Sequence, residues 1–270
     1  MNKVKRSLAL IGLLILGLTL SSCGGVRNLK QVNQGQRPLI IGLDDTFVPM
    51  GFQRQDGSLA GFDIDLARAV GRKLNQKVTF QAIDWNMKET ELKNGTIDLI
   101  WNGYTKTAAR AKKVAFSQPY LRNQQVLVTL RQDNIKSFAD MRQKKVGVQN
   151  GSSGQTLFNQ KPTVLKNIVA DHNAVLYENF NTAFLDLQAG RIQGVVGDSI
   201  YAGYYVRQQH SANKYRIISG GYPEETFAIG MRKQDTKLRR RINQALVELT
   251  NDGTVSRLSQ KWFQQDLAIK

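Results

Sequence analysis

The sequence predicts an α/β protein with parallel strands, and three observations lead to this fold class. Apolar runs typical of buried strands alternate with helical patterns from residue 39 to residue 263. Hydrophobic residues make up 41% of the chain and prolines number only five, which indicates a folded body with a core. No repeat of short fixed period and no low-complexity segment interrupts the alternation.

In the first half of the chain, apolar runs predict strands at 39–43, 78–83 and 97–101. Asp63 is placed to cap a helix whose apolar face consists of Leu66, Ala67, Val70 and Leu74. A shorter helix over 87–93 should end at the Asn-Gly pair at 94–95, because glycine commonly follows the last turn of a helix. Thr107 begins a further helix.

The second half repeats the alternation. Ser137 is placed to cap a helix over 137–144, and Asn181 opens a later helix that Gly190 closes. Asp198 begins another helix directly after a predicted strand. The remaining predicted elements are strands at 145–149, 192–196 and 227–231 and helices at 238–251 and 254–263.

The first residues predict export from the cytoplasm. A basic head at 3–6 precedes an apolar run at 8–20, which is shorter than the roughly 20 residues that a membrane-spanning helix needs. The run ends in L-S-S-C, which resembles the bacterial lipobox. We therefore expect a signal peptide over 1–22, a lipid on Cys23 and a polar tether over 23–37. The alternatives are an uncleaved anchor or a plain secretory signal, with Cys23 present by chance.

Cysteine usage and charge exclude several classes of site. Cys23 is the only cysteine, so no disulfide, thiolate nucleophile or cysteine metal site is expected elsewhere. The formal net charge is +17, and loss of the signal peptide with its three basic residues leaves +14. Such a charge is typical of nucleic-acid binding, but the export signal argues against that role, and no basic cluster is interleaved with aromatic residues. The densest basic run, 239–241, is expected to be a solvated helix face.

Polar residues gather where predicted strands end and helices begin. These junctions lie at 44–47, 102–107, 150–153 and Asp198. In parallel α/β sheets, ligands bind beyond the carboxyl ends of the strands. We therefore expect the functional site at these four places.

The junction W-N-G-Y-T-K-T-A-A-R, at 101–110, suits an anion. Gly103 allows close approach of the backbone, and Thr105 offers a hydroxyl and an amide N–H. Arg110 lies one turn into the helix that Thr107 begins, where its planar guanidinium suits two hydrogen bonds to a carboxylate. The alternative is an ordinary loop threonine and a surface arginine.

Acids and aromatic residues at the other junctions suit an ammonium group and a side chain. Asp44 and Asp198 each close a predicted strand, where a carboxylate is able to accept hydrogen bonds from a ligand ammonium. Asp198 is equally placed to cap a helix. Phe47 and Trp85 are placed to enclose a ligand side chain, although ordinary core packing is the alternative for Trp85.

Four motifs, in order, resemble those of one known family. They are D-D-T-F-V-P-M-G-F, D-G-S-L-A-G-F-D-I-D-L-A, I-D-L-I-W-N-G-Y-T-K-T-A-A-R and F-S-Q-P-Y. They look like the signatures of polar amino-acid-binding proteins, the family 3 solute-binding components of ABC importers, and the similarity covers about 39–263. The resemblance implies a type II periplasmic-binding fold, with two lobes and two hinge crossings. Lobe one would comprise 38–121 plus 224–270, and lobe two 125–220.

The resemblance also implies a role for each matching residue. The ligand carboxylate would bind to a set of polar groups, namely Arg110, Thr105 and the backbone of Ser152 or Ser153. The ligand ammonium would go to Asp198 and a backbone oxygen near Gly103. Phe47 and Trp85 would bracket the ligand side chain, with Asp44 alongside.

Two places depart from the family pattern near the expected side-chain pocket. Lys88 and Glu89 stand where relatives usually have inward-facing aliphatic residues, and Asn102 and Tyr104 replace small residues. Polar groups left dry without partners would each cost about 1–3 kcal/mol, so an apolar ligand is disfavoured. We therefore expect a polar amino acid, either amide-bearing or cationic. Glu89 favours a cation if it faces the cleft, and a neutral ligand if it pairs with Lys88 or Arg110.

The resemblance implies a binding protein rather than an enzyme, with no cofactor and no metal. Its partners would be a free amino acid, an ABC permease and ATPase, and the membrane through the lipid on Cys23. It would act at the extracytoplasmic face, and nucleic acid is not a partner. Two alternatives remain: an enzyme of the same fold, such as a cyclohexadienyl dehydratase, and a surface sensor or adhesin. His172 and His210 lie in polar stretches and supply no base beside a nucleophile.

Overall fold

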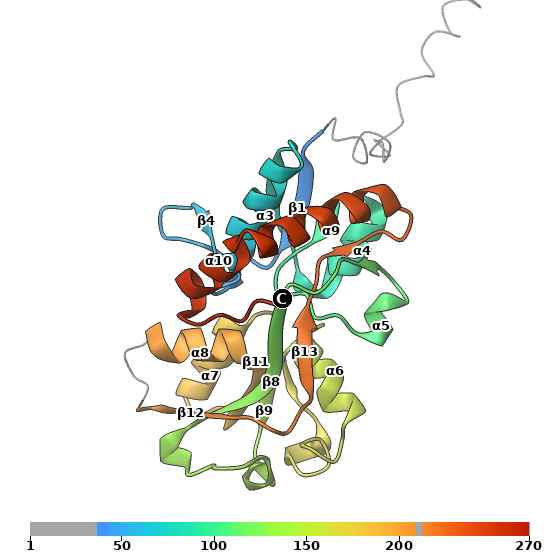
Figure 1. The fold of residues 1–270 in the computed structure, drawn as a ribbon. Helices are drawn as coiled ribbons and strands as arrows, with labels where there is room; N and C mark the ends of the chain where they lie inside the picture. Colours follow the sequence, from blue (N-terminus) through green and yellow to red (C-terminus); the bar gives the residue numbers. More distant parts are fainter. Residues whose placement is uncertain (1–36, 209–212, 270) are drawn as a thin grey trace, which may run out of the picture.

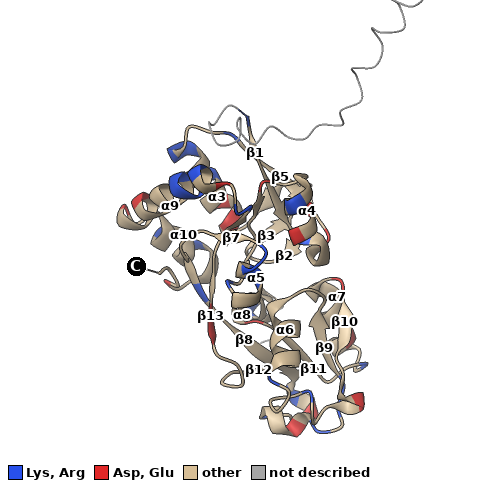
Figure 2. Ribbon diagram, turned by 90° about the vertical axis from the view of Figure 1, so that its right-hand side faces the viewer, with Lys and Arg blue, Asp and Glu red and all other residues tan. Residues whose placement is uncertain are grey.

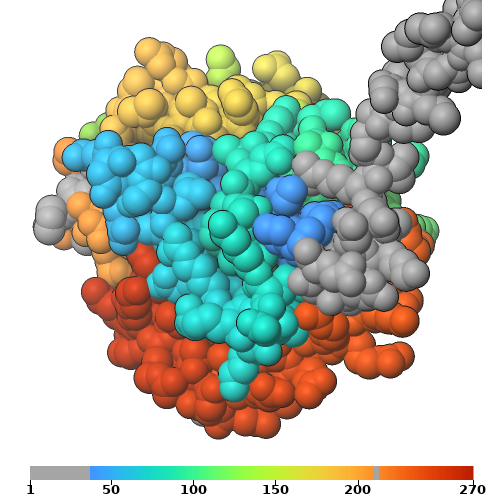
Figure 3. Space-filling model, turned by 90° about the horizontal axis from the view of Figure 1, so that it is seen from above, coloured from blue at the N-terminus to red at the C-terminus, as the bar shows by residue number. Residues whose placement is uncertain are grey.

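The computed structural model describes residues 37–208 and 213–269, and it folds them into two lobes that each surround a β-sheet (Figure 1). We call the part built on the first sheet lobe one and the part built on the second sheet lobe two. Lobe one takes its strands from both halves of the chain. Residues from the blue and the red ends of the sequence therefore lie side by side on its surface (Figure 3).

The sheet of lobe one is parallel at its centre and antiparallel at one side. Its strands lie in the order β5 (Val78–Ala82), β1 (Leu39–Leu43), β6 (Leu99–Ile100), β14 (Gly230–Met231) and β7 (Ala115–Phe116). β1 is parallel to β5 and β6, whereas β14 is antiparallel to β6 and β7. A small antiparallel sheet follows β1 and consists of β2 (Thr46–Phe47), β3 (Gly51–Gln53) and β4 (Leu59–Ala60).

The sheet of lobe two is also mixed. Its strands lie in the order β10 (Val175–Tyr177), β9 (Val146–Gln149), β11 (Gly194–Asp198), β8 (Leu121–Leu130) and β12 (Tyr215–Ile218). β9 is parallel to β10 and β11, while β8 is antiparallel to β11 and β12. The first part of β8 pairs instead with β13 (Glu224–Phe227), so these two strands form the connection between the lobes (Figure 1).

Helices cover the sheets of both lobes. Those of lobe one are α3 (Phe62–Lys73), α4 (Lys88–Asn94), α5 (Ala108–Ala111), α9 (Thr236–Asn251) and α10 (Thr254–Phe263). Those of lobe two are α6 (Ser153–Gln160), α7 (Phe180–Gln188) and α8 (Ser199–Gln208). Single 3₁₀ turns occur at η1 (Trp85–Met87), η2 (Arg131–Asp133), η3 (Phe138–Met141) and η4 (Ala170–His172). Within the described ranges, no helix is both long and apolar enough to span a membrane.

The helices α3, α9 and α10 pack against one another and supply much of the core of lobe one. On α9, Leu238, Ile242 and Leu246 recur at the spacing of one helix face and are buried. The opposite face carries basic residues, which gather on α9 in Figure 2. Arg239 and Arg240 are exposed there, as expected for a solvated face, but Arg241 is half-buried and donates to Gln76 Oε1 at 3.0 Å and to the Leu74 carbonyl at 3.2 Å.

Four local expectations from the sequence are wrong. Asp63 does not cap α3, because Gly61 takes the N-cap position and the Asp63 side chain turns inward, where it is 1% exposed. The helix expected over 137–144 is only the 3₁₀ turn η3. The strand expected over 227–231 is split between β13 and β14, since the chain passes between lobes there. Asn179, rather than Asn181, caps α7.

Candidate ligand-binding site

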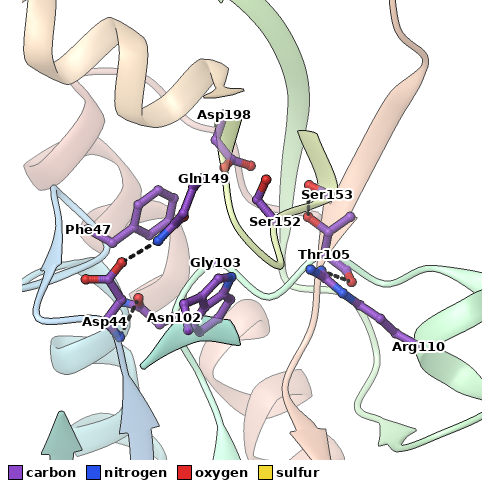
Figure 4. A pocket seen from close by; sticks show the side chains of 11 residues that line it. Asp44, Phe47, Asn102, Gly103, Thr105, Arg110, Gln149, Ser152, Ser153 and Asp198 are labelled. Atoms are coloured by element: carbon purple, nitrogen blue, oxygen red, sulfur yellow. Dashed lines mark hydrogen bonds between the residues drawn. The ribbon is translucent and has the colours of Figure 1, made fainter. Parts of the chain in front are cut away.

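The predicted junctions meet at one cavity between the two lobes (Figure 4). The carboxyl ends of β1 and β6 reach it from lobe one, and those of β9 and β11 reach it from lobe two. Its walls consist of Asp44, Phe47, Trp85, Asn102, Gly103, Thr105, Arg110, Gln149, Ser152, Ser153 and Asp198. All of these except Gln149 are residues that the sequence marks as site candidates.

Arg110 forms the cationic end of the cavity. Its Nη1 donates to the carbonyl of Thr105 at 2.9 Å, and its Nη2 donates to the carbonyl of Gly151 at 3.1 Å. The guanidinium carbon lies 4.5 Å from the centre of the Tyr104 ring. Thr107 caps α5, as predicted, and its Oγ1 accepts from the backbone N–H of Arg110 at 3.1 Å. The local backbone, the Tyr104 ring and the Gly151 carbonyl of lobe two therefore together fix where the guanidinium lies.

Hydroxyl groups from both lobes meet beside Arg110. Thr105 Oγ1 and Ser153 Oγ lie 3.1 Å apart. Ser152 caps α6, its Oγ accepting from the backbone N–H of Gln155 at 3.0 Å. The start of α6 is thus part of the cavity wall, and helix N-termini attract negative charge. This end of the cavity suits a carboxylate.

Asp198 supplies a carboxylate from lobe two. Its Oδ1 accepts from Asn123 Nδ2 at 2.5 Å and from Gln125 Nε2 at 2.8 Å. The same Gln125 nitrogen donates to Glu225 Oε2 at 3.0 Å. Burial raises the pKa of Asp198 to about 7, and the charge of Glu225 acts in the same direction. A cation placed beside Asp198 would favour its ionised form.

Asp44 lies at the opposite end of the cavity from Arg110 (Figure 4). Its Oδ1 accepts from the hydroxyl of Thr46 at 2.6 Å, and its Oδ2 accepts from Gln149 Nε2 of lobe two at 2.7 Å. Burial raises the pKa of Asp44, although the hydrogen bonds from Thr46 oppose that shift. The Phe47 ring stacks on Tyr201 at 5.7 Å, so the wall beside Asp44 is aromatic.

Gly103 brings backbone to the cavity in a conformation that requires glycine. Its φ is +57°, and a Cβ there would lie 2.6 Å from Phe47 Cε1. Its N–H donates to Asp63 Oδ2 at 2.7 Å. Asp63 also accepts from Trp101 Nε1 at 3.2 Å and from the Tyr120 hydroxyl at 3.0 Å. Asp63 therefore positions the cavity loop from within lobe one.

Two predicted site residues, Tyr104 and Glu89, do not line the cavity. Tyr104 is fully buried and stacks on Phe116, because its neighbour Gly103 turns the chain so that the phenol enters the core. Its hydroxyl donates to Glu89 Oε1 at 2.9 Å behind Arg110. The first turn of α4 directs Lys88, rather than Glu89, across to lobe two. The expectation that Tyr104 faces the side-chain pocket is wrong, and Glu89 takes the alternative in which it pairs with Lys88 and Arg110.

Gln149 is the cavity residue that the sequence interpretation missed. It is the last residue of β9, 3% exposed, and it donates to Asp44 Oδ2 from the other lobe. The rule that ligands bind beyond strand carboxyl ends would have indicated it, had the last strand residue been counted with the junction. The sequence interpretation also missed the polar network around Asp198. Its members are Asn123, Gln125 and Glu225, which lie on the connecting strands β8 and β13.

The cavity contains acids and donors but no pairing of a nucleophile with a histidine. His172 is exposed on η4 of lobe two, and His210 lies outside the described residues. Among residues 37–208 and 213–269, no group of three or more His, Cys, Asp and Glu side chains is arranged to hold a metal ion. The arrangement therefore suits recognition of a small zwitterion, with anion and cation sites on opposing walls.

Comparison with known proteins gives one family. The model of the bacterial extracellular solute-binding proteins, family 3, matches residues 39–265. A curated relative, ABC transporter arginine-binding protein 1 of Escherichia coli (strain K12), is 29% identical over 83% of this chain and 90% of its own.

Solved structures extend the similarity to the whole fold. An ABC uptake transporter substrate-binding protein from Streptococcus pneumoniae with bound histidine is 48% identical, with a TM-score of 0.88. The match covers 91% of this chain and 100% of that one. An ancestral amino acid-binding protein, described as a precursor of cyclohexadienyl dehydratase, is 30% identical with a TM-score of 0.78. That match covers 87% of this chain and 99% of the other. The predicted two-lobed periplasmic-binding fold is thus confirmed.

Proposed function

The chain belongs to the bacterial extracellular solute-binding proteins of family 3, and on that basis we propose that it captures a polar amino acid for an ABC importer. The observation that carries this proposal is that the cavity contains a site for a carboxylate and a site for an ammonium group. Arg110, with Thr105 and the start of α6, forms a site for a carboxylate, and Asp198 faces the same space from lobe two. An α-amino acid carries both charges on one carbon and matches the two sites at once.

In this proposal the α-carboxylate binds to Arg110, with the hydroxyl of Thr105 and the amides at Ser152 and Ser153 as further donors. Two parallel hydrogen bonds from a guanidinium give this contact both strength and orientation. The α-ammonium donates to Asp198 and to backbone oxygen near Gly103. Both contacts involve groups that every free amino acid possesses, so selectivity has to come from the other end of the cavity.

For the side chain we propose a basic group, as in arginine, histidine or lysine. Asp44 is a buried carboxylate at the end opposite Arg110, and Phe47 and Trp85 lie beside it. An ionised carboxylate in a dry site is stabilised by a cationic partner. The relatives named above are an arginine-binding protein and a protein with bound histidine, which supports the same class. Glu89 pairs with Lys88 and Arg110, the case in which the sequence favours a neutral ligand, so the proposal of a basic ligand rests on Asp44 and on these relatives.

Titration calorimetry tests the function directly. L-arginine, L-histidine, L-lysine, L-glutamine and L-leucine are added separately to residues 24–270. We expect a tight complex with at least one basic amino acid, weaker binding of glutamine, and no binding of leucine. If leucine binds most tightly, the polar side-chain site is wrong; if none of the five binds, the proposed function is wrong.

Delivery to a transporter requires that the lobes move and that the protein stays near the membrane. We propose that lobe one, over 38–121 plus 224–270, and lobe two, over 125–220, close on the ligand about β8 and β13. The signal peptide over 1–22 and the lipidated Cys23 lie outside the described residues, and they remain part of the proposal.

Substitution Cys23→Ser should release the protein from the membrane fraction or leave the signal uncut. Unchanged mass and fractionation would remove the anchor.

Binding rather than catalysis is the favoured activity. The arginine-binding and histidine-bound relatives are named as binding proteins. The similarity to a precursor of cyclohexadienyl dehydratase keeps an enzyme of the same fold as the second candidate, with Asp198 as its acid. Recovery of each bound amino acid unchanged after prolonged incubation would support binding, whereas a new product would favour the enzyme.

A sensor or adhesin would bind the ligand but fail to stimulate the partner ATPase in vesicles.

A further inference from the structure

The first two residues of α4 are charged, yet one of them is among the most buried side chains of the molecule. Lys88 is 2% exposed. Its Nζ donates to the carbonyl of Trp85 at 2.8 Å and to the carbonyl of Gly151 at 2.9 Å. Trp85 belongs to lobe one, whereas Gly151 belongs to lobe two. The Lys88 ammonium therefore forms a hydrogen bond across the cleft.

The same Gly151 oxygen also accepts from Arg110 Nη2 at 3.1 Å. Two cations of lobe one thus converge on one carbonyl of lobe two. Gly151 directly precedes Ser152 and Ser153, which form the lobe two wall at the carboxylate end of the cavity. Its φ is +72°, and a Cβ there would lie 3.0 Å from the Asn86 backbone. The turn therefore comes close to lobe one at this point.

Glu89 contacts Arg110 but does not line the cavity. Its Oε1 is 3.9 Å from Arg110 Nε and accepts from the Tyr104 hydroxyl at 2.9 Å. Its Oε2 is 3.5 Å from Lys88 Nζ. Burial raises the pKa of Glu89, but the charge of Lys88, the Tyr104 hydrogen bond and the charge of Arg110 together lower it below its usual value. Glu89 is consequently an ionised partner of both cations.

The charges explain why these residues occur together. Burial lowers the pKa of Lys88 to about 7, the charge of Arg110 acts in the same direction, and Glu89 opposes both. A buried ammonium is retained only where hydrogen bonds and an opposite charge compensate its lost hydration. Neither Lys88 nor Glu89 lines the cavity, so the proposed ligand contacts do not account for this arrangement.

We propose that Lys88 and Glu89 are positioning residues for the ligand α-carboxylate, an inference that rests on the proposed function. Glu89, together with the Tyr104 ring, holds the guanidinium of Arg110 from behind. Lys88 holds the Gly151 turn, and with it Ser152 and Ser153, against lobe one. The pair assembles the two halves of the carboxylate site without touching the ligand.

Two consequences separate this role from direct ligand contact. The α-carboxylate is common to all amino acids, so loss of Lys88 or Glu89 should weaken every ligand by the same factor. A residue that reads the ligand side chain would instead affect basic and neutral ligands differently. The bond from Lys88 to Gly151 joins the two lobes, so its loss should act mainly on the dissociation rate, since most affinity changes within one complex lie in that rate.

The experiment uses residues 24–270 with L-arginine, L-histidine and L-glutamine, and it measures affinity by calorimetry and rates by stopped flow. The variants are Lys88→Met, which keeps the apolar stem, Lys88→Arg, which keeps the charge, and Glu89→Gln. Lys93→Met serves as the matched control, because it removes the same charge from an exposed position of α4. The thermal midpoint of each unliganded variant reports on folding.

We expect Lys88→Met and Glu89→Gln each to weaken all ligands that bind by about tenfold, the effect of one charged hydrogen bond. For Lys88→Met most of the change should appear in the dissociation rate, and Lys88→Arg should restore much of the affinity. Lys93→Met should have no effect. A loss confined to one ligand, a loss carried by the association rate, or unchanged affinity would each overturn the inference. Failure of the wild type to bind any of the three would instead refute the proposed function.

Discussion

The two ends of the cavity are built in different ways. At the carboxylate end, Arg110 is held by the carbonyl of Thr105 and by the cap that Thr107 provides, all within six residues of sequence. At the side-chain end, Asp44 depends on Gln149, which lies 105 residues away and in the other lobe. Because its Nη2 also donates to Gly151, Arg110 is held by main-chain carbonyls of both lobes, whereas Asp44 is held largely by the side chains of Thr46 and Gln149. Substitution can therefore remove a side-chain partner of Asp44 but not the main-chain partners of Arg110.

The largest loss of affinity should follow from substitution of Arg110 at the carboxylate end. Arg110→Ala leaves a ligand carboxylate without its charged partner, and such a loss costs about 2–5 kcal/mol, or roughly 30-fold to several thousand-fold in affinity. Arg110→Lys should rescue only in part, because an ammonium lacks the two-pronged geometry of guanidinium. Calorimetry against the tightest ligand measures the loss. Less than a threefold change for Arg110→Ala would remove Arg110 from the site.

The next effect concerns Asp198 and pH. The pKa of its carboxyl is about 7, raised by burial and by the charge of Glu225. Below pH 7 the carboxyl gains a proton and loses its attraction for an ammonium, so affinity should fall by up to about tenfold per pH unit. The stability of the free protein should change in the opposite sense. A raised pKa means that the folded state binds the proton more tightly, so this group destabilises the fold above pH 7 and ceases to do so in acid.

Asp198→Asn separates this group from the rest of the protein. The variant should bind its ligand weakly at pH 8, and its affinity should no longer change between pH 5 and pH 8. Calorimetry at pH 5 and at pH 8 measures both effects. Thermal unfolding over the same range reports the stability change. If Asp198→Asn retains the wild-type slope of affinity against pH, another group is responsible for it.

At the side-chain end, Asp44→Asn should alter selectivity more than affinity. Loss of a charge-assisted hydrogen bond weakens a basic ligand by about tenfold to a hundredfold, whereas glutamine should bind about as before. The measurement is the ratio of affinities for L-arginine or L-histidine over L-glutamine in wild type and variant. An unchanged ratio would mean that Asp44 does not recognise the ligand side chain.

Gln149→Met should give the smallest effect. It removes one hydrogen bond to Asp44, about 1 kcal/mol or roughly fivefold in affinity, while a cationic ligand still supplies Asp44 with a partner. The loss should be smaller for basic ligands than for glutamine, which calorimetry with both ligands would reveal. An effect as large as that of Arg110→Ala would mean that both ends of the cavity are equally important.

How local the geometry of each site residue is explains how well its position could be predicted from the sequence. Arg110, Thr105 and Thr107 lie in one short motif, and their geometry follows from a strand end and a helix cap, so their places in the cavity could be anticipated. The positions of Tyr104 and Glu89 could not, because they depend on the +57° φ of Gly103 and on the rotation of α4 about its axis. A glycine permits a positive φ but does not impose it, and the rotation of a helix about its axis has no local sequence signal.

The connection between the lobes was also missed in part. β8 is a single strand that pairs with three others, with β13 in its first part and with β11 and β12 in the rest. The residues that it pairs with lie about 70 to 100 positions away in the sequence, and the residue pattern of β8 does not reveal these partners. The prediction of parallel strands holds for β1, β5 and β6 and for β9, β10 and β11, whereas β8 and β14 are antiparallel to their neighbours.

The Asp63 carboxylate has a mechanical consequence. It accepts at once from the Gly103 N–H of the cavity loop and from the hydroxyl of Tyr120, which directly precedes β8. Separating the loop from the start of β8 would leave a buried donor unsatisfied, at about 1–3 kcal/mol. The cavity loop and the first residues of β8 should therefore travel together as one rigid body, and the rotation between lobes should be taken up beyond Tyr120. The amide protons of Gly103 and Tyr120 should then exchange equally slowly with and without ligand.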